Sequence, residues 1–309
     1  MRLKMTKGRA NAVIAFITLL YGVSFVFIKM TINAGFSPAF IVFARGAMFF
    51  ALTLIFFGKS LTTLNLRELL IGCAAGVLSF GGYYFQTLGS KYTTPASNAF
   101  LTAMNALVVP VASLLLYREK PSKRAYLALP AGIIGMVLLT GFRLGTPLNR
   151  GDVYTLICAL LFGLHISFLG HTAAGVDYRK TAFLMAVWQM VGGGALFAAE
   201  DMSFFGTVDW SRGILSLVFL GVFCSFLAST AQIYAQKFTS PTTAGLIMVM
   251  EGVFAAALSV LLGLEPFALS LLTGGTLIML AVAIMEADFS WLFRRFSRRG
   301  GGGGDSAGE

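Results

Sequence analysis

A glutamate lies in the middle of one of the most apolar parts of this chain. Glu251 stands near the centre of the stretch 241–262, far from either end of a helix over these residues. Ionisable side chains in such surroundings are costly and usually mark a functional site with a partner. The carboxyl group could bind a cationic ligand or carry a proton. The alternative is a protonated glutamate that only hydrogen-bonds to a neighbouring helix.

A histidine occupies a comparable place in the stretch 152–172. His165 shares one helical face with Tyr154, Cys158 and Leu161, at spacings of four and three residues. It could be the partner of Glu251 or a proton relay. A neutral histidine that is hydrogen-bonded for packing explains the pattern equally well.

The stretch 95–117 carries one polar face in an otherwise apolar sequence. Asn98, Thr102 and Asn105 follow each other at helical spacing. Such a face could line a cavity, and it could also supply hydrogen bonds between helices, which contribute only about 0.6 kcal/mol each on average in membranes. We favour the cavity and include all three residues in the predicted binding site.

Two aromatic residues could wall the same cavity against an apolar or aromatic group of a ligand. They are Tyr83 and Trp188, and both could equally be packing or interfacial residues. Two basic residues, Lys29 and Arg45, also lie within apolar stretches. Long basic side chains near helix ends commonly extend to the membrane surface. A salt bridge or a gating role is the alternative, especially for the more deeply placed Arg45.

The motifs of other functional classes are missing from the sequence. It has no phosphate-binding glycine loop, no dinucleotide fingerprint, no catalytic triad and no metal-ligand spacing. We therefore predict no catalytic residues, no metal, no cofactor and no enzyme. Cys73, Cys158 and Cys224 form no CxxC pair, and we assign them to packing.

The elements that hold these residues are membrane-spanning helices. The chain is 57% hydrophobic and 12% charged, whereas a soluble domain has about 25% charged residues. A helix needs about 20 apolar residues to cross the hydrocarbon core, and a barrel would need alternating segments that are absent. The predicted fold is all-α, with ten spans at 11–33, 38–58, 68–88, 95–117, 124–141, 152–172, 181–199, 213–235, 241–262 and 267–286.

The net charge of +10 follows membrane topology rather than nucleic-acid binding. Most Lys and Arg residues fall on one side if both termini are cytoplasmic, as the positive-inside rule favours. The first stretch is too long for a signal peptide and lacks a cleavage site, so we interpret it as a retained helix. The segment 291–309 is basic and then glycine-rich, which predicts a disordered cytoplasmic tail.

An internal repeat divides the chain. Shifting residues 79–119 by 146 positions aligns them with 225–265 without a gap. The matched polar pairs include Gln86 with Gln232, Glu119 with Glu265 and the non-identical Asn105 with Glu251. We predict two halves, 1–148 and 149–290, of five spans each. An odd number of spans inverts the second half in the membrane, as in many secondary transporters.

The residues that carry this repeat resemble the drug/metabolite transporter superfamily, specifically bacterial ten-helix EamA-type transporters. The matching segments are YGVSFVFIK (21–29), Arg45-Gly46-Ala47, YTTPASNAFLTAMNALVVPVASLLLYREKP (92–121) and SPTTAGLIMVMEGVFAAALSVLLGLEP (240–266). Tyr21 stands where Trp is usual, Gly252 replaces a common Pro, and Leu264 replaces a Gly. The resemblance implies transport, often export, of amino acids, other metabolites or drugs.

We therefore expect a secondary transporter, an exporter of a small metabolite such as an amino acid, with alternating access to a cavity at the midplane. The alternative is a flippase of the same fold for lipids or lipid-linked substrates. The expected partners are a small-molecule substrate, the bilayer and, as an open alternative, a coupling proton, with no nucleic acid. The expected location is the bacterial inner membrane, as a monomer or homodimer.

Overall fold

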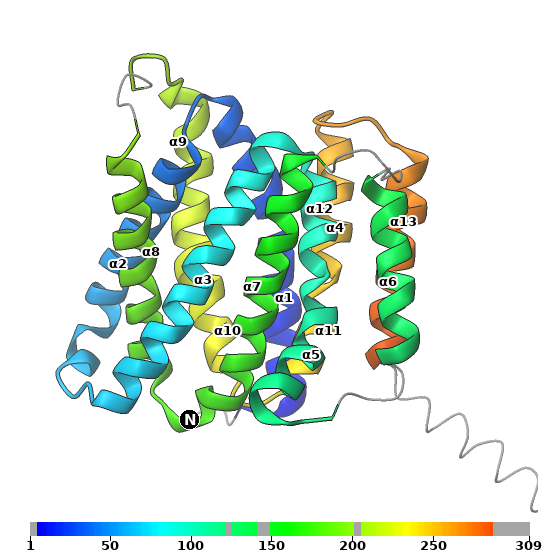
Figure 1. The fold of residues 1–309 in the computed structure, drawn as a ribbon. Helices are drawn as coiled ribbons and strands as arrows, with labels where there is room; N and C mark the ends of the chain where they lie inside the picture. Colours follow the sequence, from blue (N-terminus) through cyan, green and yellow to red (C-terminus); the bar gives the residue numbers. More distant parts are fainter. Residues whose placement is uncertain (1–4, 121–124, 141–148, 201–204, 287–309) are drawn as a thin grey trace, which may run out of the picture.

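The computed structural model describes residues 5–120, 125–140, 149–200 and 205–286. Every regular element within these ranges is a helix, and the helices stand side by side as a bundle (Figure 1). The elements are α1 (Lys7–Asn33), α2 (Pro38–Leu61), α3 (Leu66–Tyr92), α4 (Pro95–Ala103), α5 (Asn105–Tyr117), α6 (Ala125–Thr140), α7 (Arg150–Thr172), η1 (Ala173–Gly175), α8 (Tyr178–Ala198), α9 (Trp210–Phe219), η3 (Leu220–Ala228), α10 (Ser229–Ala235), α11 (Pro241–Met248), α12 (Met250–Leu261) and α13 (Leu269–Glu286).

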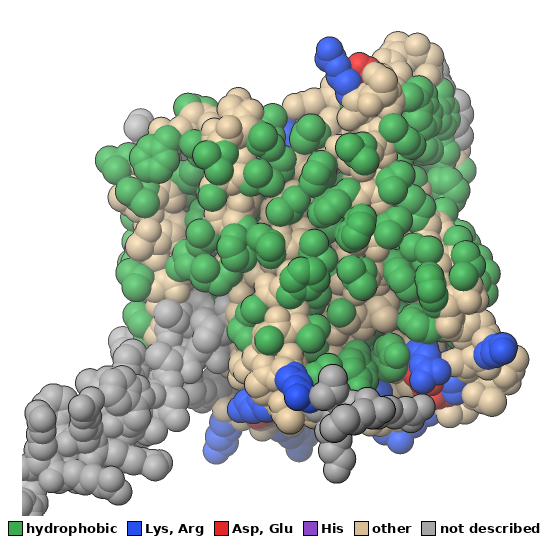
Figure 2. All heavy atoms as spheres, turned by 180° about the vertical axis from the view of Figure 1, so that it is seen from behind, with side chains coloured by type: hydrophobic (Ala, Val, Ile, Leu, Met, Phe, Trp, Pro, Cys, Tyr) green, Lys and Arg blue, Asp and Glu red, His purple; other side chains and the backbone are tan. Residues whose placement is uncertain are grey.

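These helices confirm the predicted all-α membrane fold. Among the described residues, eight continuous helical segments are long and apolar enough to cross a bilayer. The other two predicted spans correspond to α6 and α13, whose apolar helical parts are shorter. Apolar side chains cover the flank of the bundle between its two ends (Figure 2). The predicted tail 291–309 lies outside the described residues.

Local sequence signals explain where several helices begin. Ser37 accepts a hydrogen bond from the Phe40 N–H, and Pro38 follows it in the first turn of α2. Asn65 and Glu68 form a reciprocal capping box at the start of α3. Thr94 caps α4 in the same way as Ser37 caps α2. These caps satisfy N–H groups that lipid could not hydrogen-bond.

The two halves run in opposite directions through the bundle. In Figure 1, α3 ascends from the end at which the N-terminus lies, and α4 and α5 descend again. The corresponding second-half segment descends through α9, η3 and α10 and returns through α11 and α12. This reversal is the inverted arrangement that the repeat predicts.

Residues that are counterparts in the repeat also meet in space. Tyr83 donates to or accepts from Ser229 at 3.0 Å, and these two positions are 146 residues apart. Thr93 donates to Asp152 at 2.9 Å, while its counterpart Thr239 donates to Asn11 at 2.8 Å. Each of these corresponding threonines thus bonds to a residue at or near the start of the first helix of the other half. Contacts of this kind indicate a pseudo-two-fold axis between the halves.

The equivalent span of each half is interrupted near its middle. α4 ends at Ala103 and α5 begins at Asn105, while α11 ends at Met248 and α12 begins at Met250. The repeat aligns Met104 with Met250, so the two interruptions correspond to within one residue. Broken helices in transporters commonly lie beside the binding site. The interruption in the second half is present although Gly252 stands where related sequences commonly have proline.

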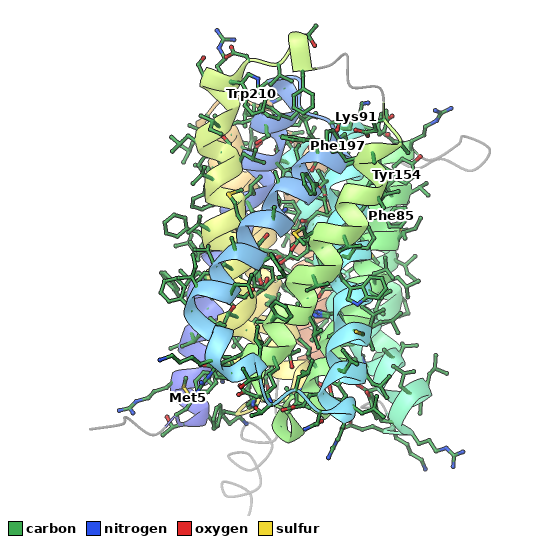
Figure 3. All side chains as sticks on the ribbon, turned by 90° about the vertical axis from the view of Figure 1, so that its left-hand side faces the viewer. Met5, Phe85, Lys91, Tyr154, Phe197 and Trp210 are labelled. Carbon is green, nitrogen blue, oxygen red and sulfur yellow. The ribbon has the colours of Figure 1, made fainter. Side chains whose placement is uncertain are left out.

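The basic side chains are distributed unevenly between the two ends of the bundle. Lys and Arg side chains gather at the end near the N-terminus (Figure 2). At the opposite end lie Trp210, Tyr154 and Lys91, far from Met5 (Figure 3). Trp and Tyr prefer the interface between membrane and water. The distribution matches the charge asymmetry that the sequence predicts.

Candidate binding cavity

A small cavity lies among the spanning helices and is enclosed by both halves of the chain. Its volume is about 30 Å³, which holds one or two water molecules. The lining residues come from the first, third and fourth spans of the first half and from four spans of the second. They are Tyr21, Ser79, Tyr83, Gln86, Thr102, Asn105, Phe162, His165, Ile166, Met185, Ser229, Gln232, Met248 and Glu251.

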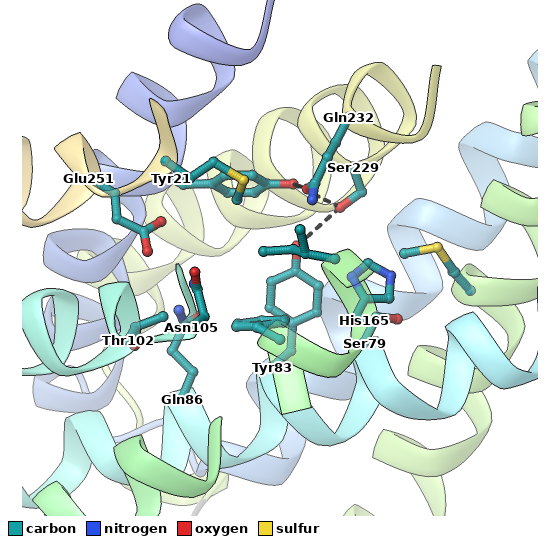
Figure 4. Close-up of a pocket in the computed structure, with 14 residues that line it drawn as sticks. Tyr21, Ser79, Tyr83, Gln86, Thr102, Asn105, His165, Ser229, Gln232 and Glu251 are labelled. Atoms are coloured by element: carbon teal, nitrogen blue, oxygen red, sulfur yellow. Dashed lines mark hydrogen bonds between the residues drawn. The ribbon is translucent and has the colours of Figure 1, made fainter. Parts of the chain in front are cut away.

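One wall of the cavity is a hydrogen-bonded polar cluster. The Tyr21 hydroxyl donates to Gln232 Oε1 at 3.0 Å and lies 3.3 Å from Ser229 Oγ. The Tyr83 hydroxyl lies 3.0 Å from the same Ser229 oxygen. Two tyrosines from the first half therefore converge on one serine of the second half, and Figure 4 shows these bonds as dashed lines. The cluster holds the halves together at the cavity.

Three further residues of the lining carry polar atoms that have no partner. Among the described residues, Glu251 Oε1, Asn105 Oδ1 and His165 Nε2 are buried and lack a hydrogen bond. All three residues line the cavity. The side chains of Glu251 and Asn105 point toward one another in Figure 4. Buried polar groups are rarely left unpaired in proteins, so these three indicate a place for a ligand or for water.

Close packing fixes Glu251 at this position. A Cβ atom added to Gly22 of α1 would lie 2.9 Å from the Glu251 carbonyl oxygen. A Cβ atom added to Gly252 would lie 2.7 Å from the Phe100 ring of α4. Only glycine allows both approaches without a shift. The helix that carries Glu251 is therefore held between α1 and α4, as small residues permit in membrane bundles.

The structure brings five of the seven predicted site residues to the cavity. They are Tyr83, Thr102, Asn105, His165 and Glu251. A pairing of His165 with Glu251, one of the alternatives that the sequence leaves open, is absent from the hydrogen bonds of the described residues, and His165 Nε2 and Glu251 Oε1 both lack partners.

The other two predicted residues lie elsewhere. Asn98 is fully buried, but its amide donates to the Gln86 carbonyl at 2.9 Å and to Ser90 Oγ at 2.6 Å, so it joins α4 to α3. Trp188 is 37% exposed, whereas Met185 and Gln189 of the same helix are buried. The packing of α8 turns the tryptophan outward, and neither Asn98 nor Trp188 is among the lining residues.

The sequence prediction missed several residues that line the cavity. From the sequence, Tyr21 stands out only as a departure from the tryptophan that is usual in sequences it resembles. The apolar walls, made by Phe162, Ile166, Met185 and Met248, gave no signal, because such residues are common throughout the spans. The repeat could have indicated Ser229, since it aligns that position with the predicted Tyr83.

The basic residues within the spans have specific partners. Lys29 donates to the backbone carbonyls of Ser90 at 2.8 Å and Thr93 at 3.0 Å, at the end of α3. It therefore does not simply extend to the surface. Arg45 is fully buried, and its Nε donates to Ser225 Oγ at 3.1 Å.

The cavity offers three kinds of contact to a ligand. Glu251 can accept hydrogen bonds from a cationic or protonated group, while Asn105 and His165 supply further polar atoms. The methionines and Phe162 provide apolar, adaptable walls. No group of three or more His, Cys, Asp or Glu side chains in the described residues could hold a metal ion. These contacts suit the binding of a small amphiphilic molecule.

Comparisons with known proteins agree with this architecture. The model of the EamA-like transporter family matches residues 9–141 and 149–286. An uncharacterized transporter of Archaeoglobus fulgidus is 30% identical over 279 residues, which is 90% of this chain and 85% of the relative. A solved structure described only as the crystal structure of a protein has a TM-score of 0.62 at 18% identity. It covers 90% of this chain and 98% of the other; at this identity it shows the fold alone.

Proposed function

Since this chain belongs to the EamA-like transporter family and is a multi-pass membrane transporter, we propose that it is a secondary transporter of a small metabolite such as an amino acid, acting as an exporter. Substrate would bind between the two halves, in the cavity near Glu251, and the cavity would open alternately to each side. The division into halves at about residue 148 belongs to the same proposal.

The observation that carries the proposal is the set of unpaired polar atoms on Glu251, Asn105 and His165. Asn105 and Glu251 lie within two residues of the corresponding interruptions of their helices. At about 30 Å³ the cavity is too small for an amino acid, so binding requires the walls to part. Such movement is expected of a site that opens to one side at a time.

The test is counterflow in proteoliposomes. Purified protein would be reconstituted into vesicles that contain unlabelled amino acids, and the entry of labelled amino acids would be followed. Exchange above that of protein-free vesicles is the expected result. Scrambling of labelled lipid without amino-acid exchange would overturn the proposal in favour of a flippase.

One feature of the structure is compatible with the alternative function, a lipid flippase. An apolar groove of about 490 Å³ lies among α4, α12 and α13, lined by residues such as Phe100, Val260 and Met279. A lipid chain could occupy such a groove. However, its lining shares no residue with the polar cavity. A flippase would need a path for the headgroup joined to a groove for the chains, so we favour transport of a small molecule.

Two glutamates that are counterparts in the repeat make different contacts at the two ends of the bundle. Alternating access requires such a difference, because the cavity is open to one side at a time. Glu265 is 9% exposed and accepts a hydrogen bond from the Ala96 N–H at 3.1 Å, at the N-terminus of α4. Its repeat counterpart is Glu119, whose side chain is 65% exposed and pairs with His171. Among the described residues, Glu265 thus contacts the N-terminus of α4, whereas Glu119 makes no corresponding contact with the N-terminus of α11. We infer that this contact helps to close that end of the cavity.

Replacing Glu265 with Ala is expected to open the end at which α4 begins. The loss of one charge-assisted hydrogen bond should raise the open population about tenfold. The natural Cys158 can report this opening. Its thiol is fully buried and lies 3.8 Å from Oγ1 of Thr102, a residue that lines the cavity. Faster labelling of Cys158 by a water-soluble maleimide is the expected result, in protein whose other cysteines are replaced.

The matched control is Glu119→Ala, which removes the repeat counterpart. It should leave the labelling rate of Cys158 close to that of the parent protein. Equal rates in the Glu265 and Glu119 variants would argue against a closing role for Glu265.

We also infer that both termini are cytoplasmic and that the chain lies in the bacterial inner membrane. The support for the orientation is the excess of Lys and Arg at the end near the N-terminus (Figure 2).

Cysteine labelling in intact cells tests this orientation. Lys120 and Arg150 are both exposed; Arg150 is the first residue of α7, and Lys120 closely follows the last residue of α5. These two helix ends lie at opposite ends of the bundle (Figure 1). With the natural cysteines replaced, Arg150→Cys should react with an impermeant maleimide in intact cells. Lys120→Cys should react only after the membrane is permeabilised. The opposite pattern would reverse the proposed orientation.

A further inference from the structure

Arg45 has an unusual environment for a guanidinium group. Its side chain is fully buried, and only Nε has a partner, Ser225 Oγ at 3.1 Å. Nη1 and Nη2 have no hydrogen bond in the described part of the chain. No carboxylate in that part forms a salt bridge with it. A buried charge without partners is strongly destabilising. An anion bound to Nη1 and Nη2 would remove this cost.

The guanidinium group lies directly behind the cavity wall. Its central carbon is 4.5 Å from the centroid of the Tyr83 ring, and Tyr83 lines the cavity. Ser225, which holds Nε, lies one turn before Ser229 of the cavity wall. A movement of the Tyr83 ring would therefore join Arg45 to the cavity. The cation–π contact with Arg45 stabilises the present position of the Tyr83 ring. A ligand that binds Arg45 would take the place of this contact.

Arg45 and Glu251 lie on different sides of the same site. Arg45 belongs to α2, which packs against α8 and η3, while Glu251 belongs to α12, which packs against α1 and α4. Figure 4 shows Glu251 and Ser229 at opposite sides of the cavity, and Arg45 bonds to Ser225 on the Ser229 side. The site thus has an acidic end and a basic end.

We propose that Arg45 binds a carboxylate group of the transported molecule, so that the substrate class is a zwitterion with its amino group at Glu251. This inference rests on the proposed transport function and names the substrate of that site. The free Nη1 and Nη2 form the fork that holds both oxygens of a carboxylate. The apolar walls between the two ends suit an apolar side chain, and binding would enlarge the cavity as Tyr83 turns aside.

The ligand part of the test compares three molecules of one carbon skeleton. Leucine carries both charged groups, isoamylamine lacks the carboxylate, and 4-methylpentanoate lacks the amino group. Phenylalanine, phenethylamine and 3-phenylpropanoate form a second set. Binding to the full-length wild-type protein in detergent would be measured by thermal shift over a range of concentrations. In at least one set, the amino acid should bind more tightly than either analogue.

The protein part of the test uses Arg45→Gln and Arg45→Lys. Arg45→Gln should weaken binding of the amino acid about 10- to 100-fold, as expected for loss of a charged hydrogen-bonding partner. It should leave binding of the amine nearly unchanged. Arg45→Lys keeps the charge without the fork and should give an intermediate loss. Arg212→Gln is the control, because the Arg212 side chain is 84% exposed and belongs to α9, which contributes no residue to the cavity.

The outcomes separate this inference from the proposed function. If wild-type protein binds the amine as tightly as the amino acid, or if Arg45→Gln weakens both equally, the assignment of Arg45 is overturned while transport stands. If the wild type binds no member of either set and shows no counterflow of any amino acid, the proposed function and the inference both fail. If Arg45→Gln does not fold, the comparison of ligands on the wild-type protein and the binding measured for Arg45→Lys still test whether Arg45 binds the carboxylate.

Discussion

The Glu251→Gln variant is expected to lose at least about 90% of counterflow activity while keeping normal expression and thermal stability. Glutamine preserves the volume of the side chain and one carbonyl acceptor, but it cannot ionise. A hydrogen bond to a charged group is worth about 1.5–3 kcal/mol, which corresponds to roughly a 10- to 100-fold effect on the interaction. Counterflow in proteoliposomes, with melting of the purified protein measured in parallel, gives the two readouts.

A carboxylate far from the cavity provides the control. Asp209 caps α9 and pairs with the exposed Arg212 at the end of the bundle. Asp209→Asn should therefore transport at the wild-type rate. If Glu251 also carries a coupling proton, the Gln variant should lose the pH dependence of whatever flux remains. Normal transport by Glu251→Gln would remove Glu251 from the site and leave it as a packing residue.

A second large effect is expected from a single methyl group at the crossing of α2 and α8. A Cβ atom added to Gly46 would lie 2.6 Å from the carbonyl carbon of Gln189, and one added to Gly193 would lie 2.7 Å from the Phe43 amide nitrogen. The two glycines thus let each helix backbone touch the other. Because backbone atoms cannot move aside as a flexible side chain can, Gly46→Ala should cost about 1–3 kcal/mol or more.

The same helix supplies a matched control for this change. Gly58 also lies in α2, but no atom is within 4 Å of an added Cβ. Gly58→Ala should leave the melting temperature unchanged or raise it, since alanine favours the helix by about 1 kcal/mol over glycine. The melting temperature of Gly46→Ala in detergent should be clearly lower than that of Gly58→Ala. Equal values would show that α2 and α8 can separate without cost.

The sequence by itself was sufficient for the membrane architecture. Helix length follows from the thickness of the hydrocarbon core, and the backbone must hydrogen-bond internally there, so apolar stretches of sufficient length predict spans. The repeat and the odd number of spans per half then predict the inversion that α3 and α9 display. The depth of Glu251 and its alignment with Asn105 were equally visible, because depth depends only on position along a span.

Only the tertiary structure decided which side of each helix faces the cavity. Asn98 and Thr102 share a helical face, yet Asn98 bonds to α3 while Thr102 lines the cavity. Trp188 turns outward and Tyr21 inward. In a water-soluble protein, polarity would separate the inner face from the outer one. In a bilayer the lipid is as apolar as the core, so the rotation of each helix is set by packing against its neighbours and by interhelical hydrogen bonds.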